Sequence, residues 1–165
     1  MFRHRPAWQS TARQTSGGFH ANHGRDEPST SQWVADQVAD YEASGGTQAN
    51  TLRDTGIPII IVTMIGAKSG KVRKIGLMRV EHEGEYALVA SKGGHAEHPD
   101  WYLNLVADPR VMIQDGPEAL DYTVREVEGA ERDAWWERSV AVFPTYEEYA
   151  AKTARLIPVL IASPV

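Results

Sequence analysis

The chain of 165 residues contains no cysteine. This absence excludes disulfide bonds, thiol catalysis and the usual cysteine-based zinc sites. No apolar run is long enough to span a bilayer, and the N-terminal residues lack the continuous hydrophobic segment of a secretory signal. We therefore expect a cytoplasmic protein.

Basic residues are fewer than acidic ones, which gives a formal net charge of -5. A nucleic-acid-binding protein presents a broad positive surface, so we expect no nucleic-acid partner. With 42% hydrophobic residues, the chain can bury one good core. The composition therefore predicts one domain that binds a small molecule.

Acidic residues are absent from the first 25 positions, which also show no core-forming period. This segment carries four arginines and three aromatic residues: Arg3, Arg5, Arg13, Arg25, Phe2, Trp8 and Phe19. We predict a disordered basic tail over residues 1–28 and a folded domain over 29–165. Peripheral contact of the tail with the anionic inner face of the plasma membrane is the alternative interpretation.

Apolar periodicity predicts the first elements of the domain. Val34, Val38 and Tyr41 recur at helical spacing, which predicts a helix over 31–44. The β-branched run 58–65 predicts a strand, followed by strands over 72–82 and 85–90. A turn at Glu83-Gly84 would make these three strands a consecutive antiparallel meander.

The second half of the chain alternates helices and strands. We expect a helix over 99–107, a hairpin of strands 110–114 and 119–127, a helix over 129–142 and a closing strand over 157–162. Thr145 is expected to cap a short helical turn before that strand. About six short antiparallel strands with peripheral helices predict an α+β domain built on a small, partly open barrel.

Residues 55–80 contain no acidic residue but five cations, which are Lys68, Lys71, Arg73, Lys74 and Arg79. The densest part, Gly66–Arg73, is a turn bracketed by glycines between two predicted strands. Several cations and free backbone N–H groups at such a turn suit a phosphate or a polycarboxylate. Lysines at hairpin ends are also often simply solvated, which is the alternative interpretation. A second glycine turn, Ser91-Lys92-Gly93-Gly94, favours a ligand that both turns hold.

These turns resemble motifs of a known family. Gly66–Arg73 is similar to the G-x-K-[ST]-G-x-x-R turn of the deazaflavin-dependent nitroreductases and quinone reductases, and Ala90–Gly94 to their A-S-K-G-G turn. Pro99–Asn104 resembles their P-x-W-Y-x-N helix start. The likeness runs over about residues 50–165 and continues at Asp108-Pro109, Trp135-Trp136, Phe143-Pro144-Thr145-Tyr146 and Ile157-Pro158-Val159. It implies a split β-barrel of the FMN-binding type.

The resemblance also implies a cofactor, the 8-hydroxy-5-deazaflavin coenzyme F(420), with its anionic tail at the first turn and its headgroup at the second. The cofactor-binding residues that it implies are Lys68, Ser69, Lys71, Arg73, Ala90, Ser91, Lys92, Gly93, Gly94, Trp101 and Asn104. Asn104 is also expected to fasten its helix. Lys71 stands where many relatives have glutamine.

The implied reaction is hydride transfer to an electron-poor, flat, apolar acceptor such as a quinone, an activated enone or a nitroaromatic. The acceptor would lie against Met78, Trp101, Phe143, Tyr146 and Tyr149. Tyr146 or Tyr149 would donate a proton, and Ser91 would orient the reactants. Relatives often have tyrosine at positions 78 and 143, so Met78 and Phe143 lack the hydroxyl groups that could orient or protonate an acceptor such as a bulky nitro-heterocycle.

Other site classes fit less well. Gly66–Val72 has three residues between its glycines, whereas a phosphate-binding P-loop needs four and then Ser or Thr after the lysine. His95 and His98 with Glu97 and Asp100 lack the spacing of a zinc site, so no metal is expected. Ser91 lacks the G-x-S-x-G elbow of a hydrolase.

Two rival functions stay open at this point. One is an FMN-binding split-barrel oxidoreductase, and the other is a module that carries deazaflavin or lipid without turnover. The sequence leaves the oligomeric state open.

Overall fold

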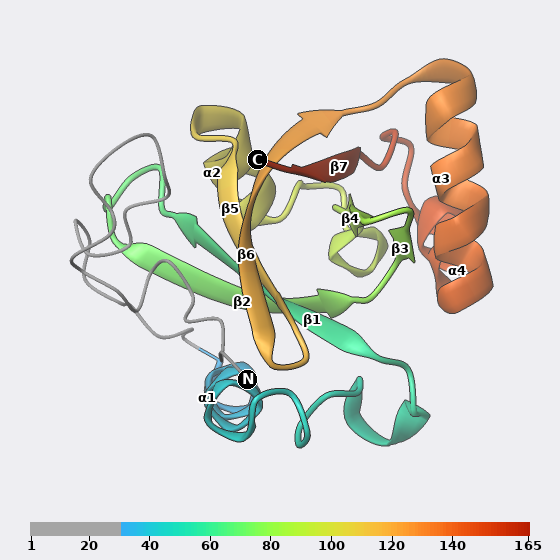
Figure 1. Ribbon diagram of the computed structural model, residues 1–165. Coiled ribbons are helices and arrows are strands. Elements are labelled where there is room, and N and C mark those ends of the chain that lie inside the picture. Colours follow the sequence, from blue (N-terminus) through green and yellow to red (C-terminus); the bar gives the residue numbers. More distant parts are fainter. Residues whose placement is uncertain (1–30) are drawn as a thin grey trace.

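The computed structural model describes residues 31–165 (Figure 1). The predicted tail over residues 1–28, and with it the membrane contact, lies outside the described residues. The helices are α1 (Gln32–Ser44), α2 (Asp100–Ala107), α3 (Gly129–Val142) and α4 (Thr145–Lys152). The strands are β1 (Ile59–Ile65), β2 (Val72–Met78), β3 (Glu81–His82), β4 (Glu85–Val89), β5 (Arg110–Asp115), β6 (Glu118–Glu126) and β7 (Val159–Pro164).

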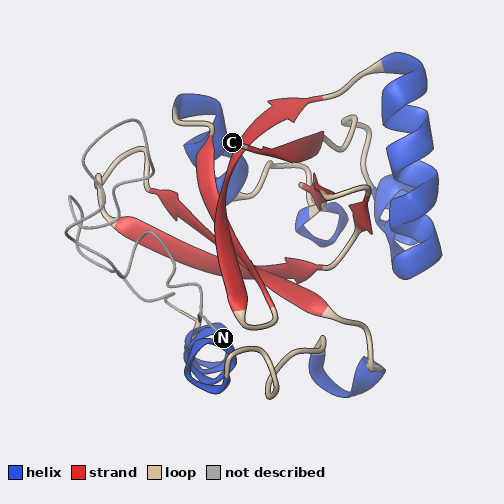
Figure 2. Ribbon diagram, in the orientation of Figure 1, coloured by secondary structure: helices blue, strands red, loops and turns tan. Residues whose placement is uncertain are grey.

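All strand pairs are antiparallel and form one sheet in the order β2-β1-β5-β6-β7-β4-β3. The sheet curls strongly, with helices at its ends and sides (Figure 2). This architecture confirms the predicted α+β split β-barrel, with seven strands in the described chain where about six were expected.

The predicted three-stranded meander is wrong. The segment 72–82 is two strands, and β2 pairs with β1 whereas β3 pairs with β4. These two hairpins lie at opposite edges of the sheet order. The β-hairpin turn at Glu83-Gly84 is confirmed, and both residues have positive φ, at 53° and 82°.

The short link Arg79-Val80 carries the chain from one sheet edge to the other. The N–H of Arg79 donates to the carbonyl of Pro58 at 2.9 Å, and the carbonyl of Val80 accepts from the N–H of Ala87 at 2.9 Å. Arg79 thus extends the β1–β2 ladder, and the next residue, Val80, extends the β3–β4 ladder. Because the two edges meet at this link, the sheet closes toward a barrel.

Strand β1 is buried on both of its faces, which explains its unbroken apolar sequence. Ile60, Val62 and Met64 face the barrel core, and the alternate Ile59 and Ile61 pack against α1. Val38 and Tyr41 of α1 are buried there, as the helical period predicted. Burial of each large apolar side chain contributes roughly 1.5–3 kcal/mol, so this double-faced strand anchors the fold.

Strand β4 is buried in the same two-sided way. Tyr86 and Leu88 point into the barrel core, and Ala87 and Val89 pack on the side of α3 and α4. The two C-terminal helices therefore cover the outer face of the β4–β7 half of the sheet (Figure 1). α4 begins after Pro144, and Thr145 is its first residue, so the prediction that Thr145 caps this helix is wrong.

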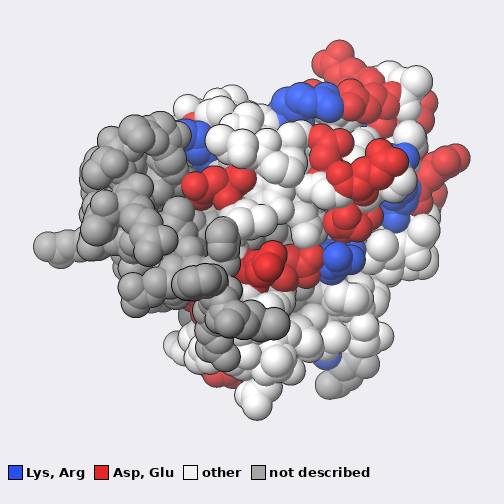
Figure 3. Space-filling view, in the orientation of Figure 1, with Lys and Arg blue, Asp and Glu red and all other residues white. Residues whose placement is uncertain are grey.

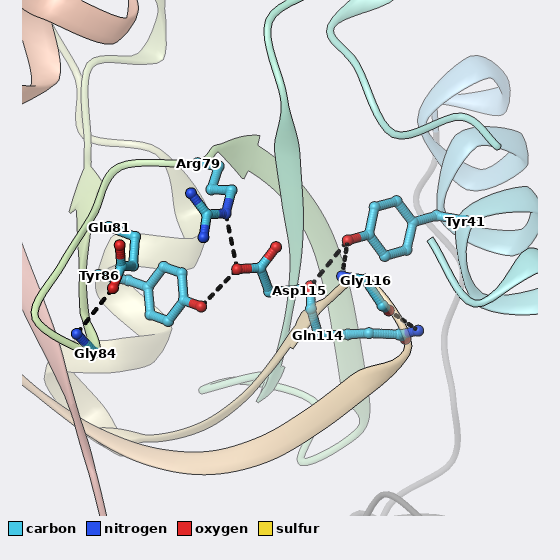
Figure 4. A network of polar contacts seen from close by, with 8 residues as sticks. All are labelled: Tyr41, Arg79, Glu81, Gly84, Tyr86, Gln114, Asp115 and Gly116. Atoms are coloured by element: carbon cyan, nitrogen blue, oxygen red, sulfur yellow. Dashed lines mark hydrogen bonds and ion pairs between the residues drawn. The ribbon is translucent and has the colours of Figure 1, made fainter. Parts of the chain in front are cut away.

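A polar network fixes the end of the barrel where the link Arg79-Val80 lies (Figure 4). Asp115 accepts hydrogen bonds from Arg79 Nε at 2.8 Å and from Tyr86 Oη at 2.6 Å. Tyr41 Oη of α1 accepts from the N–H of Gly116 at 2.7 Å. Burial and the bond to Asp115 raise the pKa of Tyr86. The network therefore ties α1, β4 and the β5–β6 turn to one another.

Candidate functional site

The cationic turn is the connection between β1 and β2. The N–H of Gly66 donates to the Lys71 carbonyl at 2.8 Å, and the N–H of Gly70 donates to the Gly66 carbonyl at 2.9 Å. Gly70 has a φ of 68°, which glycine adopts without steric cost. A Cβ on Gly66 would lie 2.8 Å from Ser69 Oγ, an oxygen that accepts a hydrogen bond from the Lys71 N–H. The two glycines thus permit a tight, closed turn.

Lys74 and Arg79 form ion pairs with residues from elsewhere in the chain. Lys74 Nζ lies 3.0 Å from Glu42 Oε2 of α1, and Arg79 pairs with Asp115. The acid-free stretch is therefore partly neutralised through the fold. Lys68, Lys71 and Arg73 are the cations of the turn itself, and they are the three predicted to hold the coenzyme tail.

A cavity of about 220 Å³ opens beside this turn. Its walls come from the turn and from α2, and comprise Gly66, Ala67, Lys68, Ser69, Arg73, Asp100, Leu103 and Asn104. Two cations and the backbone of a tight turn therefore face one space, which suits an anion. Asp100 is a carboxylate in the same wall that sequence reasoning did not include. On the face shown in Figure 3, acidic side chains prevail over basic ones, in keeping with the formal net charge of -5.

Asn104 joins α2 to the cationic turn. Its Oδ1 accepts a hydrogen bond from the N–H of Ala67 at 2.9 Å, and its Nδ2 contacts Met64 Sδ at 3.8 Å. The predicted role of Asn104 in fastening its helix is confirmed. Trp101, one turn earlier on α2, is half-buried against the barrel core and does not line the cavity.

The second glycine turn follows β4 and leads toward α2. Lys92, Gly93 and Gly94 have φ values of 46°, 62° and 81°, and Ser91 before them is right-handed and buried. Such an αR-to-αL step points successive backbone N–H groups toward one side, as in an anion-binding nest. Among residues 31–165, no backbone carbonyl accepts a hydrogen bond from the N–H groups of Ser91, Lys92 and Gly93.

Gly94 packs directly on α4. A Cβ at this position would lie 2.7 Å from the Tyr149 carbonyl oxygen and 3.1 Å from Lys152 Cβ, so only glycine fits. Lys152 Nζ in turn lies 5.6 Å above the Tyr149 ring. The structure thus brings the predicted cofactor turn and the predicted substrate residue Tyr149 together. The Lys92 side chain is exposed, and its Nζ lies 3.7 Å from Glu97 Oε2.

Four of the five predicted acceptor residues form one aromatic cluster, whereas the fifth, Trp101, packs against the barrel core instead. Met78 packs with Phe143, Tyr146 and Tyr149, and the Phe143 and Tyr146 rings meet edge to face with centroids 5.0 Å apart. Phe143 and Tyr146 are only 8% and 3% exposed, whereas Tyr149 is half-buried. Burial, with a smaller contribution from Tyr149, raises the pKa of Tyr146, so its phenol stays protonated well above neutral pH. Of the three aromatic side chains, Tyr149 is the most exposed and therefore the best placed to meet a ligand.

Sequence reasoning missed Arg155. Its guanidinium contacts the loop after β4 at the carbonyls of Ala90, Ser91 and His95, and at His98 Nδ1. Burial lowers the pKa of Arg155. Nothing in the local sequence separates this arginine from a surface one, because its partners lie about sixty residues earlier.

His98 stacks on Tyr102 with ring centroids 4.6 Å apart. Between residues 31 and 165 there is no group of three or more His, Asp or Glu side chains placed to hold a metal ion. None of the helices in this part of the chain has the length and apolarity needed to cross a bilayer.

Comparison with known proteins agrees with this geometry. Residues 33–164 match the model of the F420H(2)-dependent quinone reductase family. A quinone reductase of that name from Mycobacterium tuberculosis is 33% identical over 107 residues, which cover 63% of this chain and 72% of the relative.

Two solved structures are more similar in sequence. The structure of an F420-H2 dependent reductase is 55% identical, has a TM-score of 0.62, and the match covers 64% of this chain and 94% of that one. Another, described as a domain-swapped dimer, is 48% identical with a TM-score of 0.64, and the match covers 82% of this chain and all of that one. The chain belongs to the F420H(2)-dependent quinone reductase family.

Proposed function

We propose that this protein binds reduced coenzyme F(420) across its two glycine turns and reduces a quinone. The observation that carries the proposal is the cavity between the cationic turn and α2. It places Lys68 and Arg73 beside a backbone turn that Asn104 holds in position. FMN, the cofactor of the rival interpretation, has one phosphate and would need fewer cations.

The cationic turn would hold the anionic tail of the coenzyme, which carries a phosphodiester and several carboxylates. Arg73 can form two parallel hydrogen bonds to a phosphate, and Lys68 contributes a point charge. Lys71 is exposed on the same turn but outside the cavity wall, and we assign it to the far end of the tail. Ser69 supports the turn, because its hydroxyl oxygen accepts from the Lys71 N–H.

The turn from Ala90 to Gly94 would hold the deazaflavin headgroup through its backbone N–H groups. The left-handed residues of this turn aim those groups to one side, and the contact of Gly94 with α4 sets its position. Trp101 closes the core beneath α2 and would reach the headgroup only with its exposed part.

The bound coenzyme supplies a hydride, and a quinone becomes a hydroquinone when it gains that hydride and one proton. The protein must therefore deliver the proton and exclude water. The buried rings of Phe143 and Tyr146 provide an apolar wall, with Met78 beside them. We assign proton donation to Tyr149, whose side chain is partly accessible and whose backbone contacts the cofactor turn at Gly94. Ser91 would orient the reactants through its hydroxyl group.

The test is to mix purified protein with reduced F(420) and the soluble quinone menadione. The absorbance of oxidised deazaflavin should rise at a rate that is proportional to the concentration of protein. Tight binding of the coenzyme without reduction of menadione or of a longer-chain menaquinone would instead support the carrier interpretation. Equal affinity for FMN and F(420) would contradict the assignment of the cationic cavity.

We also propose that the N-terminal residues place the protein at an anionic membrane, where lipid-soluble quinones are found. The support is their sequence alone, which contains four arginines and no acid in the first 25 positions. This proposal is independent of the chemistry above.

A further inference from the structure

Arg155 lies between α4 and β7 and reaches across to the loop that follows β4. Its Nη2 donates to the Ser91 carbonyl at 2.8 Å, its Nη1 to the Ala90 carbonyl at 3.2 Å, and its Nε to the His95 carbonyl at 2.9 Å. Nη1 also lies 3.2 Å from His98 Nδ1, which must accept because a guanidinium only donates. One side chain thus fixes both ends of the loop 90–98.

The orientation of a carbonyl determines the orientation of the next N–H. All peptide bonds in the described chain are trans, so each N–H points opposite to the carbonyl of the same peptide plane. The Ala90 carbonyl shares its plane with the Ser91 N–H, and the Ser91 carbonyl shares its plane with the Lys92 N–H. Because both carbonyls point at Arg155, these two N–H groups point away from it.

The turn needs such a restraint. Lys92 is a non-glycine residue with a φ of 46°, a conformation that costs free energy unless the surroundings hold it. Packing of Gly94 on α4 holds the end of the turn. Arg155 holds its beginning, and within the described residues it has no carboxylate partner to compete for its donors.

We infer that Arg155 is a positioning residue that aims the N–H groups of Ser91 and Lys92 at the headgroup of the bound coenzyme. This inference rests on the proposed function, because it assigns the headgroup to the turn 91–94. Arg155 does not touch the coenzyme itself and acts through the two peptide planes. Its planar set of donors matches several carbonyls at once, which a lysine ammonium cannot reproduce.

The experiment measures the dissociation constant of oxidised F(420) by fluorescence for the full chain and for Arg155→Met, Arg155→Lys and Arg132→Met. Arg132 is the matched control, because its Nη2 also donates to a main-chain carbonyl, that of Ile157 at 2.7 Å, which does not belong to the loop 90–98. Both Arg155 variants should bind about tenfold more weakly, and Arg132→Met should bind within about twofold of wild type. Amide hydrogen exchange of the coenzyme-free protein should accelerate in the Arg155 variants only, at Gly94 and His95, whose N–H groups donate to the Ser91 and Lys92 carbonyls.

The Arg155→Lys variant distinguishes the orientation of the N–H groups from the effect of a positive charge near the turn. Wild-type affinity in Arg155→Lys would show that positive charge near the turn suffices, and would overturn the positioning role. Unchanged affinity in Arg155→Met would overturn it as well, provided that wild type binds F(420). Failure of wild type to bind would instead refute the proposed function. If neither Arg155 variant folds while Arg132→Met does, Arg155 is a folding residue and the inference is wrong.

Discussion

The Asn104 carboxamide oxygen accepts a hydrogen bond from the Ala67 N–H at 2.9 Å, across 37 positions of sequence. This contact joins α2 to the cationic turn and makes the two of them walls of one cavity. The cationic turn and the helix that follows the second glycine turn are therefore directly linked.

Replacing Asn104 separates its structural role from its electrostatic one. Asn104→Asp keeps the acceptor for the Ala67 N–H but adds a negative charge to the cavity, so the melting temperature should hold while F(420) affinity falls. Asn104→Ala removes the hydrogen bond, which costs roughly 0.5–1.5 kcal/mol of stability, and should lower both. Thermal melts and fluorescence titrations measure the two effects. Unchanged affinity in Asn104→Asp would place the coenzyme elsewhere.

Replacing Asp100 should strengthen F(420) binding, in contrast to replacing Asn104. Its carboxylate lies in the wall of the cavity with Lys68 and Arg73 and repels an anionic ligand. Asp100→Asn should therefore tighten F(420) binding, by up to roughly 1 kcal/mol for an exposed charge, and the gain should shrink in high salt. Glu137→Gln is the control, because Glu137 is an exposed carboxylate on α3 and does not line the cavity. Weaker binding by the asparagine variant would contradict this assignment.

Tyr146 and Tyr149 should behave differently as phenylalanines. Tyr149→Phe removes the assigned proton donor and should lower kcat for menadione while F(420) affinity stays within about twofold. Tyr146 is buried with a raised pKa, so Tyr146→Phe should leave kcat nearly unchanged. Steady-state kinetics with both variants decides the matter, and the reverse pattern would transfer the donor role to Tyr146.

Local patterns predicted much of this fold. α3 begins and ends where helical spacing placed it, and the β5–β6 hairpin turns at Gly116 and Pro117, between the two strands expected there. The pairing of strands was not predictable in the same way, because period-2 alternation identifies a strand but not its neighbour. Arg79-Val80 looks like a continuation of β2 in sequence, yet here the chain passes between sheet edges.

The candidate site was likewise predictable only in part. Glycine and cation spacing marked both turns, and the family resemblance supplied the aromatic cluster. Asp100 and Arg155 were missed in their present roles because their partners are distant in sequence. Burial of Phe143 and Tyr146 was also hidden, since an aromatic residue looks the same in a core and in a pocket wall.

The N-terminal residues give an independent prediction. Full-length protein should sediment with anionic liposomes at low salt and be released as salt rises, whereas a variant lacking residues 2–28 should stay in solution. The truncation should keep its melting temperature and its F(420) affinity. Equal sedimentation of both proteins would exclude the membrane role of this segment.

The most direct test of the cationic turn is the salt dependence of F(420) affinity in wild type and in the triple variant Lys68→Ala, Lys71→Ala and Arg73→Ala. Each substitution should cost roughly 1–3 kcal/mol of binding free energy, the range for hydrogen bonds to charged groups. Wild-type affinity should fall as salt rises, and the triple variant should lose most of that dependence because salt screens charge pairs. Lys74→Ala, which removes a cation paired with Glu42, should lower stability and leave the affinity and its salt dependence in place. If the triple variant binds F(420) as tightly as wild type at every salt concentration, the turn is a solvated hairpin end and the account of the site is wrong.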